Sequence, residues 1–391
     1  MSITLRVLGG ADIGGSCYLL EAPNARVLLD CGSYIGKPYN THPEIPDPET
    51  VDAILISHAH MDHIGNIAYV ASVCKNATIY MTRPTEFFIR HQLTETIAEY
   101  IGATTEALRY SNELLCSLVM NRCQIVGEEQ SVKLKGGKIQ FVFFSAGHIP
   151  GAVMIYLRMA GKTVLYSGDF SSAETELVNG YSLSDHIPTP DCLLLCAVHP
   201  APRENESVSY ESKEDELRYA EVAHHGLFIN VQELTKGLEV LALLDRMKMS
   251  YTLWLDNPMW NIATSYADFS DRFTVPEFAH PLSERMRRDS RFECIFLTKE
   301  TLKAVSKHAD PHRPYKHFDK LACTQYGELV PNFSLHASYE EMCRFINTLG
   351  PQSTYLVHVP KETTEEQLED LRASVSCTVV RTANGTRYTI C

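Results

Sequence analysis

Short apolar runs separated by turn residues fill the first third of the chain and predict β-strands. The pairs Gly9-Gly10, Gly14-Gly15 and Pro23-Asn24 stand between these runs, and glycine, proline and asparagine in such positions mark turns. Two later stretches, 66–73 and 85–100, carry apolar residues at the spacing of a helix. The strands are expected at residues 3–8, 17–21, 26–30 and 51–56.

The alternation of strand and helix signals continues and indicates the fold class. A strand-rich block covers residues 138–166, and strands and helices alternate from residue 201, with a helix expected at 261–269 and no clear period over 278–320. Towards the C-terminus we expect helices at 339–348 and 365–374, a strand at 354–358 and a closing pair of strands around Asn384-Gly385. Strand blocks with interleaved helices are typical of a layered α/β architecture with the sheets in the middle. The stretch after residue 201 indicates a small α/β insertion.

Charge and cysteine content narrow the class of protein. With 35 Lys and Arg against 48 Asp and Glu, the net charge is -13, which excludes a protein that coats nucleic acid through overall positive charge. A local basic groove or bound cations remain compatible with a polyanionic substrate. The 12 cysteines are scattered without a CxxC pair, as in proteins of reducing compartments. Because no signal peptide or apolar run of about 20 residues is present, we expect an intracellular protein without membrane contact.

A dense cluster of metal-binding side chains follows the strand expected at 51–56. His58 and His60 are two positions apart, so their imidazoles point the same way in an extended chain. If the chain then turns into a helix, Asp62 and His63 face back towards the same point. Imidazole and carboxylate donors together suit zinc, iron or manganese. The alternative is a histidine-rich surface loop without a ligand, against which the preceding strand and the aspartate both argue.

Three further donors stand at the ends of other predicted strands, and these are His148, Asp169 and His358. Functional side chains of α/β proteins gather at such strand ends. A single histidine is more often a hydrogen-bonding residue than a metal ligand, but a site for two ions needs donors from several segments. The sequence therefore predicts a dinuclear metal centre.

These motifs resemble those of the metallo-β-lactamase superfamily, and within it those of the β-CASP nucleases, a group of RNA-processing metallo-hydrolases. Further stretches similar to that group are residues 9–17, 28–32, 146–152, 255–259 and 333–339. The resemblance implies an αββα sandwich interrupted by a small α/β cap that is reduced and divergent. It places the metallo-β-lactamase domain at 1–198 and 326–391, and the β-CASP-like cap at 199–325.

The resemblance also implies a cofactor and a role for each candidate residue. It implies two divalent ions, zinc foremost, with manganese or iron as alternatives. The expected ligands are His58, His60 and His148 for one ion, Asp62, His63 and His358 for the other, and Asp169 as the bridge between them. A hydroxide shared by the ions would attack phosphorus. Asp62 and His336 are the expected catalytic residues, with His336 contacting the scissile phosphate or protonating the leaving oxygen.

The chain departs from the family pattern beside the expected catalytic histidine. Cys196 stands where the family has an acid that orients this histidine, so the partner of His336 is left open. Candidates for that role are His199, Glu204 and Glu206. The cap is also short, and its basic residues gather between 285 and 316, where they could follow a phosphate backbone or simply face solvent.

Three functions are compatible with these observations. The first is a phosphodiesterase or nuclease acting on RNA or other single-stranded nucleic acid, and it fits the motifs best. The second is a hydrolase of a small ester, thioester or phosphodiester. The third is a weakly active subunit of an RNA 3′-end processing complex. The expected partners are RNA and either a second copy of the chain or a processing complex, in the cytoplasm or the nucleus.

Overall fold

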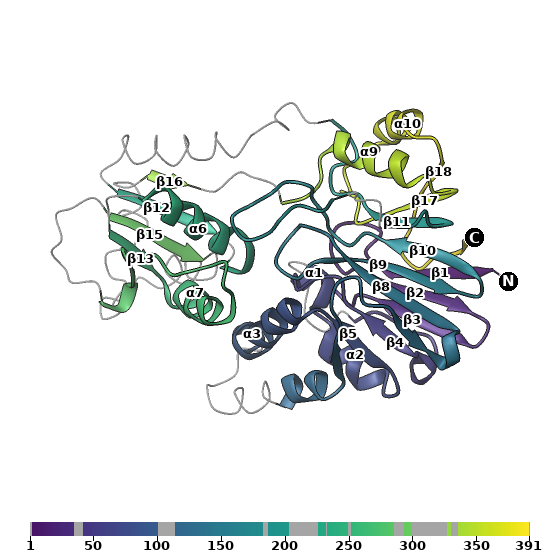
Figure 1. The fold of residues 1–391 in the computed structure, drawn as a ribbon, viewed down its shortest axis with the longest axis horizontal. Helices are drawn as coiled ribbons and strands as arrows, with labels where there is room; N and C mark the ends of the chain where they lie inside the picture. Colours follow the sequence, from purple (N-terminus) through teal and green to yellow (C-terminus); the bar gives the residue numbers. More distant parts are fainter. Residues whose placement is uncertain are drawn as a thin grey trace. The chain divides into compact units, whose positions relative to one another are not determined.

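Three β-sheets organise the part of the chain that the structure describes (Figure 1). The computed structural model describes residues 2–34, 42–100, 114–182, 187–202, 226–231, 233–248, 252–284, 293–298, 327–329 and 335–390. The chain forms two units. Unit 1 comprises Met1–Glu174, Val178–Glu204 and Leu335–Cys391, and unit 2 comprises Thr175–Leu177 and Asn205–Ser334. The domain limits expected near residues 198 and 325 stay a prediction.

Unit 1 contains two sheets of seven described strands each. The first sheet has the order β19 (Arg387–Ile390), β1 (Ile3–Gly9), β2 (Cys17–Ala22), β3 (Ala25–Leu29), β4 (Ala53–Leu55), β5 (Thr78–Met81) and β6 (Cys123–Ile125). The second has the order β18 (Thr378–Arg381), β17 (Ser353–Val357), β11 (Cys192–Cys196), β10 (Lys162–Tyr166), β9 (Val153–Met159), β8 (Ile139–Ser145) and β7 (Val132–Leu134). Each sheet is antiparallel on one side and parallel on the other.

The main core lies between these two sheets. Strand β1 buries every second residue, as expected for a strand with one face against the core. Aromatic rings from the two sheets meet edge to face: Tyr80 lies 5.1 Å from Phe141, and Tyr18 lies 5.5 Å from Tyr166, measured between ring centroids. Because a fully buried large apolar side chain contributes about 1.5–3 kcal/mol, this shared core holds the sheets together.

Helices cover the outer faces of both sheets (Figure 1). Near β4 and β5 lie α1 (Met61–Ile64), α2 (Ile67–Val73) and α3 (Arg83–Tyr100), and near β17 and β18 lie α9 (Tyr339–Leu349) and α10 (Glu365–Ser374). Single helical turns occur at η1 (Pro48–Thr50) and η2 (Lys135–Gly137). Phe345 of α9 packs on Phe170, with ring centroids 4.8 Å apart. The order helix, sheet, sheet, helix confirms the predicted αββα sandwich.

The two closing strands belong to different sheets. The sequence predicts a closing pair of strands around Asn384-Gly385, but β18 pairs with β17 and β19 pairs with β1. Gly385 has a φ of 77°, a value that glycine adopts easily, and its N–H bonds the carbonyl of Val7. The turn therefore carries the chain from one sheet to the other, and a hairpin does not form.

Unit 2 is a small parallel α/β unit, as the strand and helix alternation predicts. Its sheet has the order β14 (Ala279–Pro281), β13 (Thr252–Leu255), β15 (Glu293–Thr298), β12 (Gly226–Val231) and β16 (Gly327–Leu329), and all described pairings are parallel. Its helical segments are η3 (Glu233–Gly237), α6 (Leu238–Met247), α7 (Asn257–Phe269) and η4 (Leu282–Glu284). Helix α7 begins before the expected residue 261, because Asp256 caps it by accepting a hydrogen bond from the N–H of Met259.

None of the helices among the described residues is both long enough and apolar enough to cross a lipid bilayer.

The backbone of α1 lies directly against the loop that follows β3. The N–H of Gly32 bonds the carbonyl of Ser16, the N–H of Ser16 bonds the carbonyl of Asp62, and the N–H of Cys31 bonds the carbonyl of His63, each at 2.8 Å. A Cβ atom on Gly32 would lie 1.7 Å from the Asp62 carbonyl oxygen. The short helix can therefore dock here only if residue 32 has no side chain.

We predict that Gly32→Ala lowers the free energy of unfolding by roughly 1–3 kcal/mol, because α1 must move away from the added methyl group. Gly127→Ala is the matched control, since the nearest atom to its added Cβ would be 3.6 Å away, an ordinary contact. Urea unfolding of both variants measures the effect. Equal stability of the two variants would contradict the close packing.

Candidate metal centre

The donors predicted from the sequence come together at one end of unit 1. His58 and His60 follow β4, and Asp62 and His63 lie on α1 immediately after them. The other three follow strands of the second sheet: β8 precedes His148, β10 precedes Asp169, and β17 precedes His358. His60 is extended, with φ -70° and ψ 146°, and α1 begins at the next residue. This is the turn from strand to helix that the spacing of the cluster predicts.

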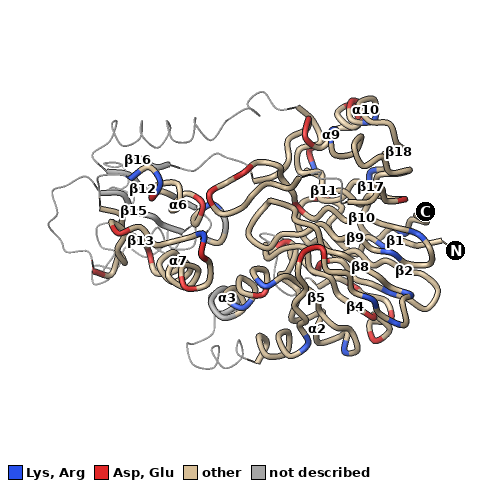
Figure 2. The backbone as a smooth tube through the Cα atoms, in the orientation of Figure 1, with Lys and Arg blue, Asp and Glu red and all other residues tan. Residues whose placement is uncertain are grey.

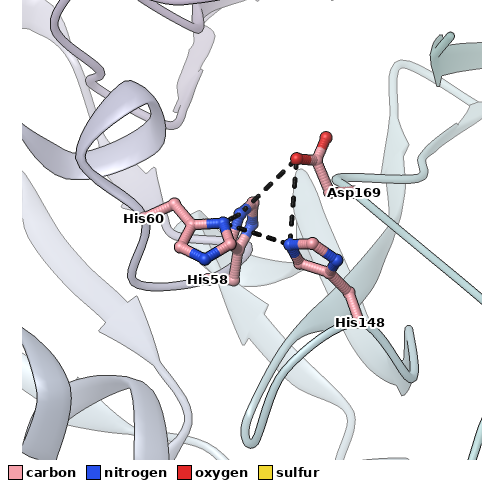
Figure 3. Close-up of side chains that lie close together, drawn as sticks. All are labelled: His58, His60, His148 and Asp169. Atoms are coloured by element: carbon pink, nitrogen blue, oxygen red, sulfur yellow. Dashed lines mark hydrogen bonds and ion pairs between the residues drawn. The ribbon is translucent and has the colours of Figure 1, made fainter. Parts of the chain in front are cut away.

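One group of donors contains His58, His60, His148 and Asp169 (Figure 3). The Nδ1 atom of His60 lies 3.1 Å from Nε2 of His58 and 3.1 Å from Nε2 of His148. The Oδ2 atom of Asp169 lies 3.8 Å from Nε2 of His58 and 3.9 Å from Nε2 of His148. Two nitrogen ligands of a tetrahedral zinc ion are about 3.3 Å apart. The spacing of these atoms is therefore close to that of a ligand set around one ion.

A second group contains Asp62, His63 and His358. The Nε2 atom of His358 lies 3.4 Å from Oδ2 of Asp62. The Oδ2 atom of Asp169 is 3.6 Å from Nε2 of His63 and 4.0 Å from Nε2 of His358. Asp169 thus faces both groups with the same oxygen atom, which is the arrangement expected of a bridging carboxylate.

Oxygen atoms behind the site hold four of the imidazoles by their Nδ1 atoms. These contacts are Ser57 Oγ with His58 at 3.0 Å, Asp30 Oδ2 with His63 at 2.8 Å, the Leu335 carbonyl with His148 at 2.7 Å, and Ser16 Oγ with His358 at 3.1 Å. An oxygen at Nδ1 fixes the orientation of the ring and leaves Nε2 to bind a cation, as in known metal sites. His60 differs, because its Nδ1 atom faces the site.

Asp30 is the supporting residue that the sequence analysis did not assign. It is fully buried, and its carboxylate accepts hydrogen bonds from the N–H and hydroxyl of Ser57, both at 2.7 Å, and from the hydroxyl of Tyr166 at 2.6 Å. The available signal was an aspartate at the end of a strand, followed by Cys31 and Gly32. It could not be assigned from the sequence because its partners lie on three other segments.

Backbone conformation also orients the candidate ligands. Asp30 and His358 both have φ of 56°, a left-handed conformation that non-glycine residues adopt at some cost and mostly at functional sites. Gly147, directly before His148, has φ of 71°, and a Cβ atom there would lie 2.3 Å from the carbonyl oxygen of Ser171. The loop that carries His148 therefore needs glycine at this position.

Burial and neighbouring charges set the protonation of the site. Burial, together with neighbouring histidines, holds the pKa of His58 and of His60 well below the usual range, and lowers the pKa of His148 to about 3. For Asp169, burial opposes ionisation, but His358 and His63 outweigh burial and hold its pKa well below the usual range. For His63 burial lowers the pKa, and the carboxylates of Asp169 and Asp30 reverse this and raise it. The neutral imidazoles of His58, His60 and His148 beside the ionised carboxylate of Asp169 are suited to a cation.

One buried atom that lines the site has no hydrogen-bond partner among the described residues. It is the Nε2 atom of His63, which lies 3.6 Å from Oδ2 of Asp169. Buried polar atoms are nearly always paired, and each unpaired one is costly. A nitrogen lone pair without a partner is what a divalent ion satisfies. The donor set therefore fits divalent metal.

His336 lies beside the two groups. Its Nε2 atom is 3.2 Å from Oδ2 of Asp169, and its ring centroid is 4.7 Å from that of His148. The side chain is 30% exposed, whereas that of Asp169 is 1% exposed. His336 is therefore held at the centre and is also accessible from outside.

The thiol at position 196 turns towards another residue. Cys196 is buried, and its Sγ atom lies 3.7 Å from the hydroxyl of Tyr166. The ring of His199 lies edge-on to that of His336, with centroids 6.0 Å apart. Of the three candidate partners of His336, His199 is thus beside it, and Glu204 and Glu206 lie outside the described residues.

Comparison with known proteins agrees with this geometry. Residues 10–192 match the family model described as the metallo-beta-lactamase superfamily. Endoribonuclease YSH1 of Mycosarcoma maydis is 26% identical over 334 residues, which are 79% of this chain and 36% of that protein. Ribonuclease TTHA0252 of Thermus thermophilus is 31% identical over 180 residues, which are 44% of this chain and 38% of that protein.

The chain spans little more than a third of the length of these two relatives. The crystal structure of a protein of unknown function from Enterococcus faecalis V583 matches this chain with a TM-score of 0.68 and 16% identity, covering 100% of both chains. That likeness concerns the fold alone. Residues 10–192 therefore resemble the metallo-β-lactamase superfamily, and the similarity of the chain to endoribonucleases agrees with the predicted β-CASP group.

Proposed function

We propose that this chain is a metal-dependent phosphodiesterase that cleaves RNA. The observation that carries the proposal is the position of Asp169, whose Oδ2 atom faces both donor groups and also lies 3.2 Å from Nε2 of His336. A dinuclear site with a general acid beside it has the parts that hydrolysis of a phosphodiester requires. The similarity to proteins named as endoribonucleases supports RNA as the substrate.

The proposed cofactor is a pair of zinc ions, with manganese or iron as alternatives. His58, His60 and His148 would hold one ion, Asp62, His63 and His358 the other, and Asp169 both. When bound, such ions lower the pKa of water towards about 7 and offset negative charge on phosphoryl oxygens.

The protein's own contribution is to orient groups and move a proton. The Oδ2 atom of Asp169 accepts a hydrogen bond from Nε2–H of His336, so it directs the imidazole. His336 is the accessible member of this pair, and it would give its proton to the leaving oxygen of the substrate. Asp62, at 14% exposure, would serve as a ligand and assist proton transfer.

Positive and negative side chains are mixed along the described chain, so these residues do not mark the path of the RNA. Figure 2 shows Lys and Arg interspersed with Asp and Glu along the described chain. Several of these cations are paired, as Arg6 and Arg26 are with Glu21 and Lys135 is with Asp52. The basic residues between 285 and 316 lie outside the described part of the chain, and we propose that they follow the phosphate backbone. A second copy or a processing complex remains the expected partner.

The paired cations also favour a second candidate, a hydrolase of a small ester or phosphodiester. Such a substrate needs the metal centre but no long cationic surface. The two functions differ in their response to salt, because contacts with a polyanion release counterions and weaken as salt rises.

We predict that His60→Ala removes most of the metal bound by the three-histidine group and lowers the rate of RNA cleavage at least about 10²-fold. The reason is that Nδ1 of His60 is the atom closest to both other imidazoles. Metal content by elemental analysis and cleavage of labelled RNA measure the effect. His280→Ala, an exposed histidine of β14, is the control, and a fully active, metal-free His60→Ala protein would refute the assignment.

We predict that His336→Ala keeps its metal and cleaves RNA about 10²–10⁴-fold more slowly, the usual contribution of a general acid. Metal content and single-turnover rates on the same preparation test this prediction. An unchanged rate on RNA would remove His336 from the catalytic residues and favour the small-substrate function.

We predict that purified protein with zinc or manganese cleaves labelled RNA in preference to single-stranded DNA and to a chromogenic phosphodiester. RNA cleavage should fall steeply between 50 and 200 mM salt, by roughly 10³-fold in affinity if about six phosphates are contacted. Hydrolysis of the chromogenic compound should change little over the same range. A salt-independent reaction on the small compound alone would establish the second candidate.

A further inference from the structure

We propose that helix α3 is a positioning element of the metal centre, acting through Thr85 and Gln92. It fixes the segment that carries His148 relative to the segment that carries His58 and His60. The inference rests on the metal-binding part of the proposed function and needs no assumption about the substrate.

The start of α3 is bonded to the loop that carries His148. The hydroxyls of Thr82 and Thr85 donate to the carbonyl oxygen of Gly151, at 2.7 and 3.0 Å. Both threonines are buried, at 4% and 0% exposure. A Cβ atom on Gly151 would lie 2.8 Å from the backbone nitrogen of Thr85. The helix start and this loop are therefore in direct contact, three residues beyond His148.

The middle of α3 is bonded to the other ligand segment. The Nε2 atom of Gln92 donates to the carbonyl oxygen of Ala59 at 2.9 Å, and Ala59 stands between His58 and His60. Gln92 is 3% exposed, and its Oε1 atom has no hydrogen-bond partner among the described residues. An apolar side chain of similar size would avoid burying that unpaired oxygen. The hydrogen bond from the Gln92 amide to the carbonyl oxygen of Ala59 is the interaction that offsets this cost.

These two bonds lie on one face of the helix. Thr85 and Gln92 are seven residues apart, which is close to two turns and about 10 Å along the axis. Their partners belong to segments from different sheets, because Ala59 follows β4 of the first sheet and Gly151 follows β8 of the second. A helix is stiff over two turns, so α3 sets the distance between the two segments.

The contact that depends on this distance is the one between His60 and His148. Their Nδ1 and Nε2 atoms are 3.1 Å apart, and ligands must be held within about 0.5 Å of the required geometry for a preformed site. Loss of either bond to α3 would let the segments drift apart. The fold would survive, and the affinity for metal would fall.

The test is zinc affinity of the full chain after its metal has been stripped. Gln92→Leu and Thr85→Val each remove one donor with little change in volume. Both should raise the zinc Kd about 10–100-fold, the usual effect of losing a group that orients a ligand, as measured by competition with a chromogenic chelator. Thermal unfolding of the metal-free proteins shows whether each variant is folded. Thr85→Ser, which keeps the hydroxyl, should restore the wild-type Kd.

Gln140→Leu is the matched control, because the side-chain amide of Gln140 on β8 donates to Ser131 in an exposed contact. Its zinc Kd should equal that of the wild type. If Gln92→Leu and Thr85→Val lower the melting temperature but keep the wild-type Kd, the two residues are merely structural and the inference is wrong. If Gln92→Leu does not fold, Gln92→Met and Thr85→Val decide the question in the same assay.

Wild-type protein that binds zinc but leaves RNA intact would refute the proposed function and leave this inference standing.

Discussion

The buried carboxylate of Asp169 can be ionised only because groups from several parts of the chain surround it. An ionised carboxylate at 1% exposure is unfavourable unless opposite charge or donors surround it. Here imidazoles from β4, α1 and the ends of β8 and β17 approach its Oδ2 atom to within 3.6–4.0 Å. Those segments belong to both sheets of unit 1, so the sandwich must close before these imidazoles surround the carboxylate. The core between the two sheets is therefore what assembles the site.

The candidate ligands are held in place by a second set of specific residues. Asp30, fully buried, holds His63 and is itself held by Ser57 and Tyr166. Helix α1 can approach this region only because Gly32 has no side chain. The result is a set of imidazoles whose orientation is fixed before any ion arrives, which lowers the reorganisation that binding would otherwise require.

The sequence predicts those parts of the fold and site whose causes are local. The spacing of His58, His60 and Asp62 is enough to predict that their side chains point towards one place, because two-residue periodicity and a following helix are local properties. The sandwich follows from strand blocks alternating with helices. The separate sheets of β18 and β19 could not be predicted, since pairing partners lie far away in the chain. Gln92 and Leu335 were missed for the same reason: each acts through one hydrogen bond to a distant segment.

The surroundings of His336 depart from the expected family pattern at position 196. The strand end at Cys196 provides a thiol turned to Tyr166, so it gives His336 no carboxylate. The carboxylate of Asp169 lies 3.2 Å from Nε2 of His336, and it is the same group that faces both donor groups. A metal ion held by Asp169 would therefore share this carboxylate with His336, and metal binding and the position of the proton donor would be linked through one oxygen atom. An acid separate from the two donor groups would not create this link.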